Sequence, residues 1–427
     1  MIKSLLQYFY YLLGEGVSKG IIFLTFSVFT NYFSKEDFGR LALFWITIPF
    51  FSIFIDFAQR SYIKKRLLHS KKRAVESIFR AVISSTIITV IFLILKALTT
   101  TLQIYVVDET FDKYIIFCAY FYAIIEIVLS YFQIGGLIKQ YNIYYALRNA
   151  APYLFTITVI LLLKQERIFE PVLFAQIQLI VFILIAVIAL YKVSKIHAGI
   201  KIKSITSQLK KRIWISLKFS LPIVPGILSA LFLSFADRFI INYYYSEIEV
   251  ADYTVAYTIS SIFMAFFLAT NKMWQKFILE NLKANNLIKL SRAARNYIGI
   301  VISVGAIIII LKSYLVLIMA NKSYFVILDI IPTIILGMFF YFLYTVLSNI
   351  PFYHRNTFLM ALPAIIAAIL NLILNFILIP KFGYKVAAIT TTISYFIEFV
   401  VIYILCLKKY KTDILFNGLT KRFLRTS

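Results

Sequence analysis

The chain has few of the residues that build metal sites and disulfide frameworks. Its 427 residues include two cysteines and three histidines. Cys118 and Cys406 each fall inside an apolar stretch, so no disulfide framework is implied. His69, His197 and His354 are too scattered along the sequence to form a metal site. We therefore expect no bound metal and no cofactor.

Motifs for nucleotide binding and nucleophilic catalysis are missing as well. The sequence has no GxxxxGK[ST] loop to hold a nucleotide phosphate, and nothing in its connecting segments resembles a nucleophile elbow or a paired-carboxylate catalytic site. We therefore expect that the protein is not an enzyme. Any transport would draw its energy from an ion gradient or the membrane potential.

Charged residues are scarce, at 15% of the chain, whereas hydrophobic residues make up 61% and the mean hydropathy is +0.86. Typical soluble domains carry about 25% charged residues. The 41 phenylalanines and 30 tyrosines suit helices that face lipid and the membrane interface. This composition predicts an all-α integral membrane protein.

Long apolar runs divide the chain into twelve predicted membrane-spanning helices. A span needs about 20 residues, at about 1.5 Å each, to cross roughly 30 Å of hydrocarbon. The amino terminus has no small-residue cleavage site, which favours a retained first span over a signal peptide. The predicted spans are residues 7–32, 39–59, 78–95, 114–138, 145–163, 172–191, 219–244, 250–271, 297–319, 327–347, 357–379 and 387–407.

The connections between these spans carry an asymmetric charge. If both termini are cytoplasmic, most of the 44 lysines and arginines lie on the inner side, as the positive-inside rule requires. We therefore expect a multi-pass protein with both termini in the cytoplasm. The basic runs lack interleaved stacking aromatics, which argues against a nucleic-acid partner and favours attraction to anionic lipid.

The two halves of the chain share a short pattern. Tyr244, Tyr245 and Ser246 repeat the aromatic pair and serine at residues 32–34, and an acidic residue follows three positions after each serine. Similar halves are common in membrane transporters. We therefore expect an N-terminal lobe, residues 1–205, and a C-terminal lobe, residues 206–427.

The predicted seventh span begins next to the junction of these halves. The basic amphipathic sequence LKKRIWISLKF, residues 209–219, precedes it and is suited to lie along the inner membrane surface. Pro222 and Pro225 then free backbone carbonyls and permit bending of the helix. We therefore expect the linker between the lobes to act as a hinge.

Polar residues inside the spans are the candidates for function, because intramembrane charges usually face a cavity or a partner. Glu15 and Lys19 share one face of the first span. They form either a self-neutralised pair or a site facing the lumen. Glu126 and Glu398 lie near the middle of the fourth and twelfth spans without a partner nearby in sequence. Each is either a silent protonated group or a proton-titrating site.

Asp237 and Arg238 are adjacent in the seventh span and project about 100° apart on a helix. We therefore expect that they do not face the same neighbour. Either both tie neighbouring helices together, or Arg238 offers its guanidinium to phosphate oxygens. In the eleventh span Asn371 and Asn375 share a face, which predicts hydrogen bonds between helices.

Three segments of the sequence are informative in combination: LPIVPGILSALFLSFADRFIINYYYSEIEVADYTVAY, residues 221–257, NLILNFILIPKFGYKVAAITTTISYF, residues 371–396, and NYFSKEDFGRLAL, residues 31–43. Together they resemble the Wzx-type O-antigen flippases, the polysaccharide transporters of the multidrug/oligosaccharidyl-lipid/polysaccharide (MOP) exporter superfamily. The first resembles their seventh and eighth spans, the second their eleventh-to-twelfth junction, and the third their first outside turn. The resemblance implies about twelve transmembrane helices in two six-helix lobes around a central cavity.

The resemblance also implies a function. The cargo would be an oligosaccharide repeat on undecaprenyl pyrophosphate, moved across a bacterial plasma membrane by alternating access. By polarity and depth, Lys19 and Arg238 are candidates to contact the pyrophosphate or sugar, and Glu15, Glu126, Asp237 and Glu398 are candidates for ion coupling. Membrane lipid, a polysaccharide polymerase and a chain-length regulator are candidate partners.

Three alternatives stay open. A multidrug exporter or a lipid II exporter of the same superfamily would share the architecture, although lipid II flippases usually have two further spans. An O-antigen polymerase, a membrane glycosyltransferase, would also be rich in aromatic residues. Such polymerases usually carry a large outside loop, and this sequence has none of that length.

Overall fold

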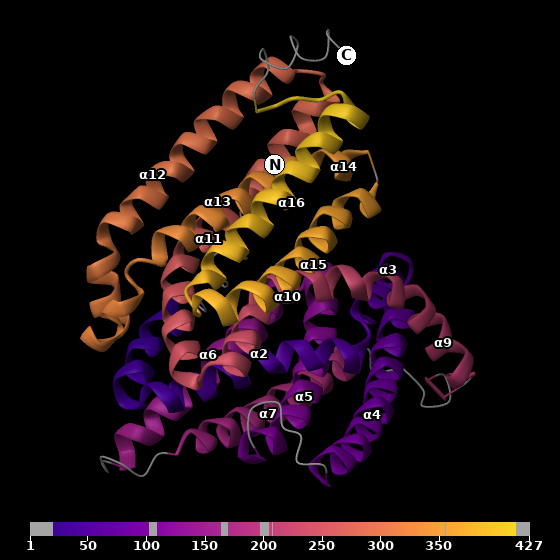
Figure 1. Cartoon of the computed structure of the whole chain (residues 1–427). Coiled ribbons are helices and arrows are strands. Elements are labelled where there is room, and N and C mark those ends of the chain that lie inside the picture. The colour runs from indigo at the N-terminus through magenta and orange to yellow at the C-terminus, as the bar shows by residue number, and fades with distance from the viewer. Residues whose placement is uncertain are drawn as a thin grey trace. The chain divides into compact units, whose positions relative to one another are not determined.

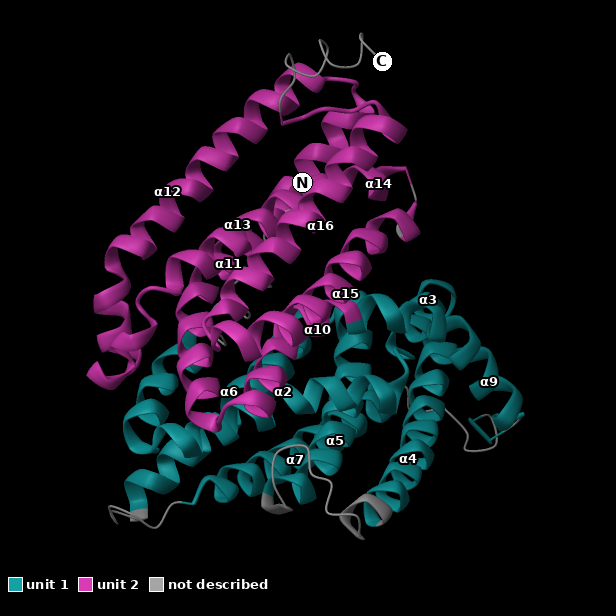
Figure 2. Ribbon diagram, viewed as in Figure 1, with its two compact units in different colours: residues 1–228 teal, residues 229–427 magenta. Residues whose placement is uncertain are grey.

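The computed structural model describes residues 20–101, 109–163, 170–196, 205–206, 208–354 and 356–415. Within these ranges the chain is helical and contains no strand. Its contacts divide it into two compact units, residues 1–228 and residues 229–427 (Figure 2). The prediction of an all-α membrane protein is confirmed.

The first unit begins, in its described part, with a short apolar helix over Gly20–Tyr32. The helices that follow are labelled in Figure 1. They are α2 (Lys35–Asp56), α3 (Arg60–His69), α4 (Lys71–Thr101), α5 (Glu109–Ile134), α6 (Ile138–Leu163), α7 (Pro171–Ile196), α9 (Leu209–Ser220), the 3-10 turn η1 (Leu221–Ile223) and the start of α10 (Val224–Tyr244).

The second unit contains the rest of α10 and the helices after it (Figure 1). These are α11 (Glu247–Lys283), α12 (Leu287–Met319), the 3-10 helix η2 (Lys322–Ile327), α13 (Ile331–Leu347), α14 (Asn349–Tyr353), α15 (Thr357–Phe382) and α16 (Val386–Tyr410).

Eleven helical segments in the described ranges are long and apolar enough to cross a membrane. They correspond to the second to twelfth predicted spans, and Gly20–Tyr32 is the described end of the first. Several helices continue past the predicted apolar limits. For example, α11 has 37 residues and α12 has 33. The reason is that helical hydrogen bonding continues through the polar residues flanking a span, whereas hydropathy marks the apolar part alone.

The repeat seen in the sequence recurs as a pair of matching helix caps. Ser34 Oγ accepts the backbone N–H of Asp37 at 3.1 Å and donates to its carboxylate at 2.7 Å, at the start of α2. At the start of α11, Ser246 Oγ accepts the N–H of Ile248 at 3.2 Å and donates to Glu249 at 2.6 Å. Each serine thereby satisfies one of the free N–H donors of a helix N-terminus, and the acidic residue accepts the serine hydroxyl.

Two stretches predicted as connections are helices. The first follows the second predicted span and forms α3 and the start of α4. Between α2 and α3 the chain turns at Phe57 and Ala58, which have φ values of 43° and 56°. This left-handed conformation is unfavourable for residues other than glycine. The Asp56 carboxylate stabilises the turn by accepting the N–H of Ala58 at 2.8 Å. The second stretch is the basic segment before the seventh span, which forms α9.

Each unit is organised around one or two central helices. In the first unit α5 packs against α2, α3, α4, α6 and α7. In the second unit α16 packs against α13 and α15, and α13 also packs against α11. The buried residues that fill these contacts are mainly phenylalanine, isoleucine and alanine.

The predicted hydrogen bonds between helices at Asn371 and Asn375 are confirmed. Asn371 Nδ2 donates to Thr391 Oγ1 at 3.3 Å, and Thr390 donates to Asn375 Oδ1, so α15 and α16 are joined by polar side chains. Asn375 Nδ2 also donates to Asn371 Oδ1 at 3.0 Å. Such bonds hold apolar helices in register where water is absent.

Candidate functional site

Asp237 and Arg238 form a buried ion pair within α10. Nη1 of Arg238 lies 3.0 Å from Oδ1 of Asp237, and the side chains are 3% and 1% exposed, respectively. Nη1 also donates to the carbonyl oxygen of Ser234 at 2.7 Å. Because both charges are buried, each requires the other for neutralisation.

The expectation that the two side chains do not face the same neighbour is wrong. The Arg238 side chain is long enough to reach back along the helix, and its guanidinium lies over two tyrosine rings of α11. Its carbon Cζ is 4.3 Å from the ring centre of Tyr257 and 5.4 Å from that of Tyr253. Asp237 also interacts electrostatically with Tyr253. Both members of the pair therefore meet α11.

A row of tyrosines continues from this pair within the second unit. The hydroxyl groups of Tyr257 and of Tyr395, on α16, are close enough to interact electrostatically. The Tyr395 ring centre lies 5.1 Å from that of Tyr341 on α13, and the Tyr341 ring stacks 5.9 Å from Tyr344. Tyrosine rings offer flat apolar faces and hydroxyl groups, which suits them to sugars and to cations.

Glu398 lies at the other end of this row. It is 1% exposed on α16, and it interacts electrostatically with Tyr341, Tyr344 and Tyr395. Its Oε2 has no hydrogen-bond partner among the described residues. A carboxylate buried in this way needs a proton or a cation to neutralise it.

Glu126 lies on α5 between arginines from two other helices of the first unit. Nη1 of Arg60, on α3, donates to Glu126 Oε2 at 2.9 Å, and Nη1 of Arg148, on α6, donates to Oε1. The Arg148 guanidinium is 4.7 Å from the ring centre of Tyr122 and 5.1 Å from that of Tyr145. Glu126 is therefore already matched by cations within its own unit.

Two more groups extend this network. The carboxylate of Asp56, at the end of α2, lies 3.8 Å from Nε of Arg60, so two acids alternate with two arginines. Burial, and then the nearby charge of Arg60, lower the pKa of Lys64 on α3. Folding therefore disfavours the charged form of Lys64 beside this network.

The remaining sequence candidates, Glu15 and Lys19, lie outside the described residues. Sequence reasoning missed Arg60, Arg148 and the tyrosine row. The arginines are 66 and 22 residues from Glu126, so no local pattern could pair them. Tyr253 and Tyr257 lie one helical turn apart, but this spacing does not single them out among 30 tyrosines.

The second unit therefore combines three chemical elements within its helices. A guanidinium can bind phosphate oxygens, tyrosine rings can stack on sugars, and an isolated carboxyl can accept a proton or meet a cation. The described residues contain no group of three or more His, Cys, Asp or Glu side chains that could hold a metal ion.

Solved structures with a similar fold are membrane transporters. An inward-facing multidrug resistance MATE family transporter of the MOP superfamily matches with a TM-score of 0.68 at 15% identity, over 93% of each chain. The lipid II flippase MurJ, in its inward closed conformation, matches with a TM-score of 0.69 at 16% identity, over 94% of this chain and 87% of MurJ. An outward-facing MATE transporter matches with a TM-score of 0.59 at 13% identity, over 93% of each chain.

At these identities the likeness establishes the fold, which is that of the MATE and MurJ transporters. None of the curated protein sequences matches the chain significantly. The model of one protein family, described as polysaccharide biosynthesis protein, matches residues 5–274, well over half of the chain. The chain thus has a membrane transporter fold and belongs to the polysaccharide biosynthesis protein family.

Proposed function

We propose that the protein is a flippase for oligosaccharide repeat units linked to undecaprenyl pyrophosphate. It moves them from the cytoplasmic to the outer leaflet by alternating access, for O-antigen, capsule or exopolysaccharide synthesis. The family supports a role in polysaccharide synthesis, and the fold supports transport. The observation that carries the proposal is the buried Arg238 guanidinium packed on Tyr253 and Tyr257 inside a membrane helix.

Arg238 is the candidate for binding the pyrophosphate in the second unit, and Lys19 is the candidate in the first. A guanidinium presents several donors in one plane and stays charged at all physiological pH values. The rings of Tyr253 and Tyr257 hold that plane in place, and the tyrosine row toward Tyr395 offers stacking faces to the sugars. The phosphate would take over the role of Asp237 as the anionic partner of Arg238.

The membrane potential is sufficient to drive the outward step. A pyrophosphate with about two negative charges gains about 4.6 kcal/mol when it moves outward across an inside-negative potential of about 100 mV. An inward-moving proton would add to this gain. The proposal therefore requires no nucleotide.

Glu398 is the coupling residue that the geometry favours among the three acidic candidates that the structure describes. It is buried among tyrosines, and the described residues give its Oε2 no hydrogen-bond partner. Glu126 and Asp237 are already paired with arginines. They would bind an ion only after an arginine moved away. Glu15 stays a candidate together with its neighbour Lys19.

We place the protein in a bacterial plasma membrane with both termini in the cytoplasm, as the basic connections suggest. There it would hand its cargo to a polysaccharide polymerase acting with a chain-length regulator. We assign residues 1–205 and 206–427 to the two functional lobes. The segment that joins them contains α9, Pro222 in η1 and Pro225 at the start of α10.

The test is the surface glycan of a strain that lacks the gene, resolved by repeat number and compared with its pool of lipid-linked repeats. Absence of surface repeats, with single lipid-linked repeats collecting on the cytoplasmic side, is the expected result. Complementation with the Arg238→Lys variant should leave the defect, whereas complementation with Lys276→Gln, at an exposed position on α11, should correct it.

Other outcomes would identify the alternatives. Single repeats at the surface without long chains would make the protein a polymerase. An unchanged glycan would favour a multidrug exporter, which the MATE-like fold supports. Accumulation of lipid II inside the cell would favour a lipid II exporter, which the MurJ-like fold supports.

A further inference from the structure

Helix α9 exposes a face that is both basic and apolar. At about 100° per residue, five side chains fall within an arc of about 140°. All five are exposed in the structure, including Trp214 at 65% and Ile215 at 42%. They are Lys210, Lys211, Trp214, Ile215 and Lys218. A helix face directed at water would be polar throughout, so the exposed tryptophan and isoleucine need an apolar neighbour.

The opposite face of α9 packs against α3 and α4. Nη1 of Arg212 lies 3.9 Å from the carboxylate of Glu76 on α4. The Phe219 ring lies 5.7 Å from that of Tyr62 on α3, and Nζ of Lys65 lies 4.4 Å from the Phe219 ring centre. Because α3 and α4 occupy this face, the basic and apolar face cannot turn inward.

The length of the helical segment places α9 outside the hydrocarbon core. Residues Leu209–Tyr244, which comprise α9, η1 and α10, form one apolar segment of 36 residues. A continuous helix of 36 residues would measure about 54 Å, whereas the core is roughly 30 Å thick. The 21 residues of α10 alone are about the length needed to cross it. α9 therefore lies at the membrane boundary, where lipid headgroups are found.

We propose that the exposed face of α9 binds anionic phospholipid headgroups, with Lys210 and Lys211 attracting the phosphates and Trp214 anchored at the interface. α9 contains no acidic residue that could neutralise its lysines. Interfacial basic helices combine these features: cations for the headgroups, and an aromatic ring at the boundary with the acyl chains. Zwitterionic lipid alone would leave the lysines without matching charge.

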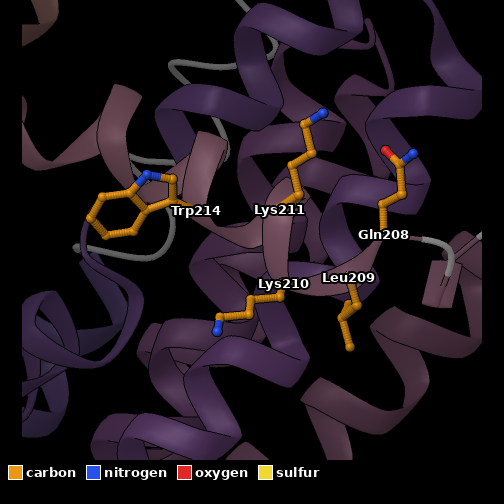
Figure 3. A pocket seen from close by; sticks show the side chains of 5 residues that line it. All are labelled: Gln208, Leu209, Lys210, Lys211 and Trp214. Carbon is orange, nitrogen blue, oxygen red and sulfur yellow. The ribbon is translucent and has the colours of Figure 1, made fainter.

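The start of α9 also borders an open hollow. Gln208, Leu209, Lys210, Lys211 and Trp214 line it, mainly with apolar atoms (Figure 3). The beginning of α4, which packs on α9, exposes further cations at residues 71–73. Anionic lipid would therefore meet exposed cations from both α4 and α9.

The test measures which lipid touches Trp214 in the full-length protein. The protein is reconstituted into bilayers of phosphatidylcholine and phosphatidylglycerol at one fixed composition, with bromine atoms on either lipid. Brominated lipid quenches nearby tryptophan, and subtracting the signal of a Trp214→Phe variant isolates Trp214. Preferential quenching by brominated phosphatidylglycerol is expected, with about a fivefold local enrichment for each nearby lysine.

The Lys210→Gln/Lys211→Gln double variant should bring the quenching ratio of the two lipids close to one. The matched control, Lys408→Gln/Lys409→Gln, removes the same charge from exposed positions on α16 and should keep the parent ratio. Equal quenching by both lipids in the parent protein, or no quenching by either, would overturn the proposal. So would a ratio that falls equally in the control. No cargo is needed, so the result is independent of the proposed transport.

Discussion

Arg238 pairs with Asp237, the residue directly before it in α10, through an Nη1–Oδ1 distance of 3.0 Å. A pair of adjacent residues is unusual as an ion pair in a helix, because their side chains start about 100° apart. Here the guanidinium is directed by the rings of Tyr253 and Tyr257 on α11. The arginine is thereby neutralised at rest while its ring-stacked plane stays in a defined position.

The first prediction separates the folding role of this pair from its transport role. Arg238→Gln leaves Asp237 buried without a cation and should lower the free energy of unfolding by about 3 to 5 kcal/mol. Asp237→Asn/Arg238→Gln removes both charges and should recover most of this loss. Denaturation of the purified protein in detergent measures the stability. Repeat-unit transport should stay absent in the double variant, because the phosphate ligand is missing. Transport at the parent rate in that variant would limit Arg238 to a structural role.

The second prediction concerns the ring beneath the guanidinium. Tyr257→Phe keeps the aromatic face and should retain transport, whereas Tyr257→Ala should lose it together with about 0.5 to 2 kcal/mol of cation–π interaction. Tyr243→Ala, at a position on α10 that is 76% exposed, is the control. Surface glycan yield at equal protein level provides the measurement. Equal yields from the phenylalanine and alanine variants would show that the ring does not orient Arg238.

The third prediction tests Glu398 as the coupling residue. Glu398→Gln keeps the size of the side chain but cannot bind a proton or a cation as a carboxylate does. Transport in proteoliposomes should therefore lose its dependence on an imposed proton or sodium gradient, while folding is unaffected, because a buried charge has been removed. The control is Glu280→Gln, since Glu280 is 65% exposed on α11. A gradient response identical to that of the parent would exclude Glu398 from coupling.

The fourth prediction concerns Glu126. Its removal leaves Arg60 and Arg148 facing each other without their shared carboxylate. Glu126→Ala should therefore lower the free energy of unfolding by about 3 to 5 kcal/mol. Glu36→Gln, which removes an exposed partner of Arg40 on α2, should change it by less than about 1 kcal/mol. A stable Glu126→Gln variant that no longer responds to ion gradients would contradict this structural role.

The fifth prediction is a pH dependence at Lys64. Burial and Arg60 lower the pKa of Lys64 in the folded protein, so folding disfavours its charged form. The unfolded chain then binds more protons between the folded and the ordinary pKa, and stability should rise with pH across that alkaline interval. Lys64→Gln should flatten this rise, whereas Lys71→Gln, at an exposed site, should leave it. The measurement is denaturation at a series of alkaline pH values, and an unchanged slope in Lys64→Gln would refute it.

The lipid-spanning helices could be predicted closely because a span is a local property of the sequence. Each requires about 20 apolar residues in succession, which hydropathy detects directly. The caps at Ser34 and Ser246 also follow from short patterns. The predicted ends were less exact, as α11 continues to Lys283, well past its apolar part. Helices can extend into the headgroup region, where hydropathy no longer marks them.

Part of the candidate site could be anticipated in the same way. Asp237, Arg238, Glu126 and Glu398 were recognisable because a charge in an apolar helix is conspicuous. Their partners were not recognisable. Tyr257 lies 19 residues after Arg238 on another helix, and nothing in the spacing distinguishes it from the other tyrosines.

By itself, the sequence determined the membrane class, the all-helical fold and the positions of the spans, because lipid requires apolar residues and internally bonded backbone in every crossing segment. Only the tertiary structure decided which charges meet. Helix packing brought Arg60 and Arg148 to Glu126, directed Arg238 back to Asp237, and left Oε2 of Glu398 without a hydrogen-bond partner among the described residues. These pairings depend on which helices are neighbours and on side-chain reach, and neither is encoded in local spacing.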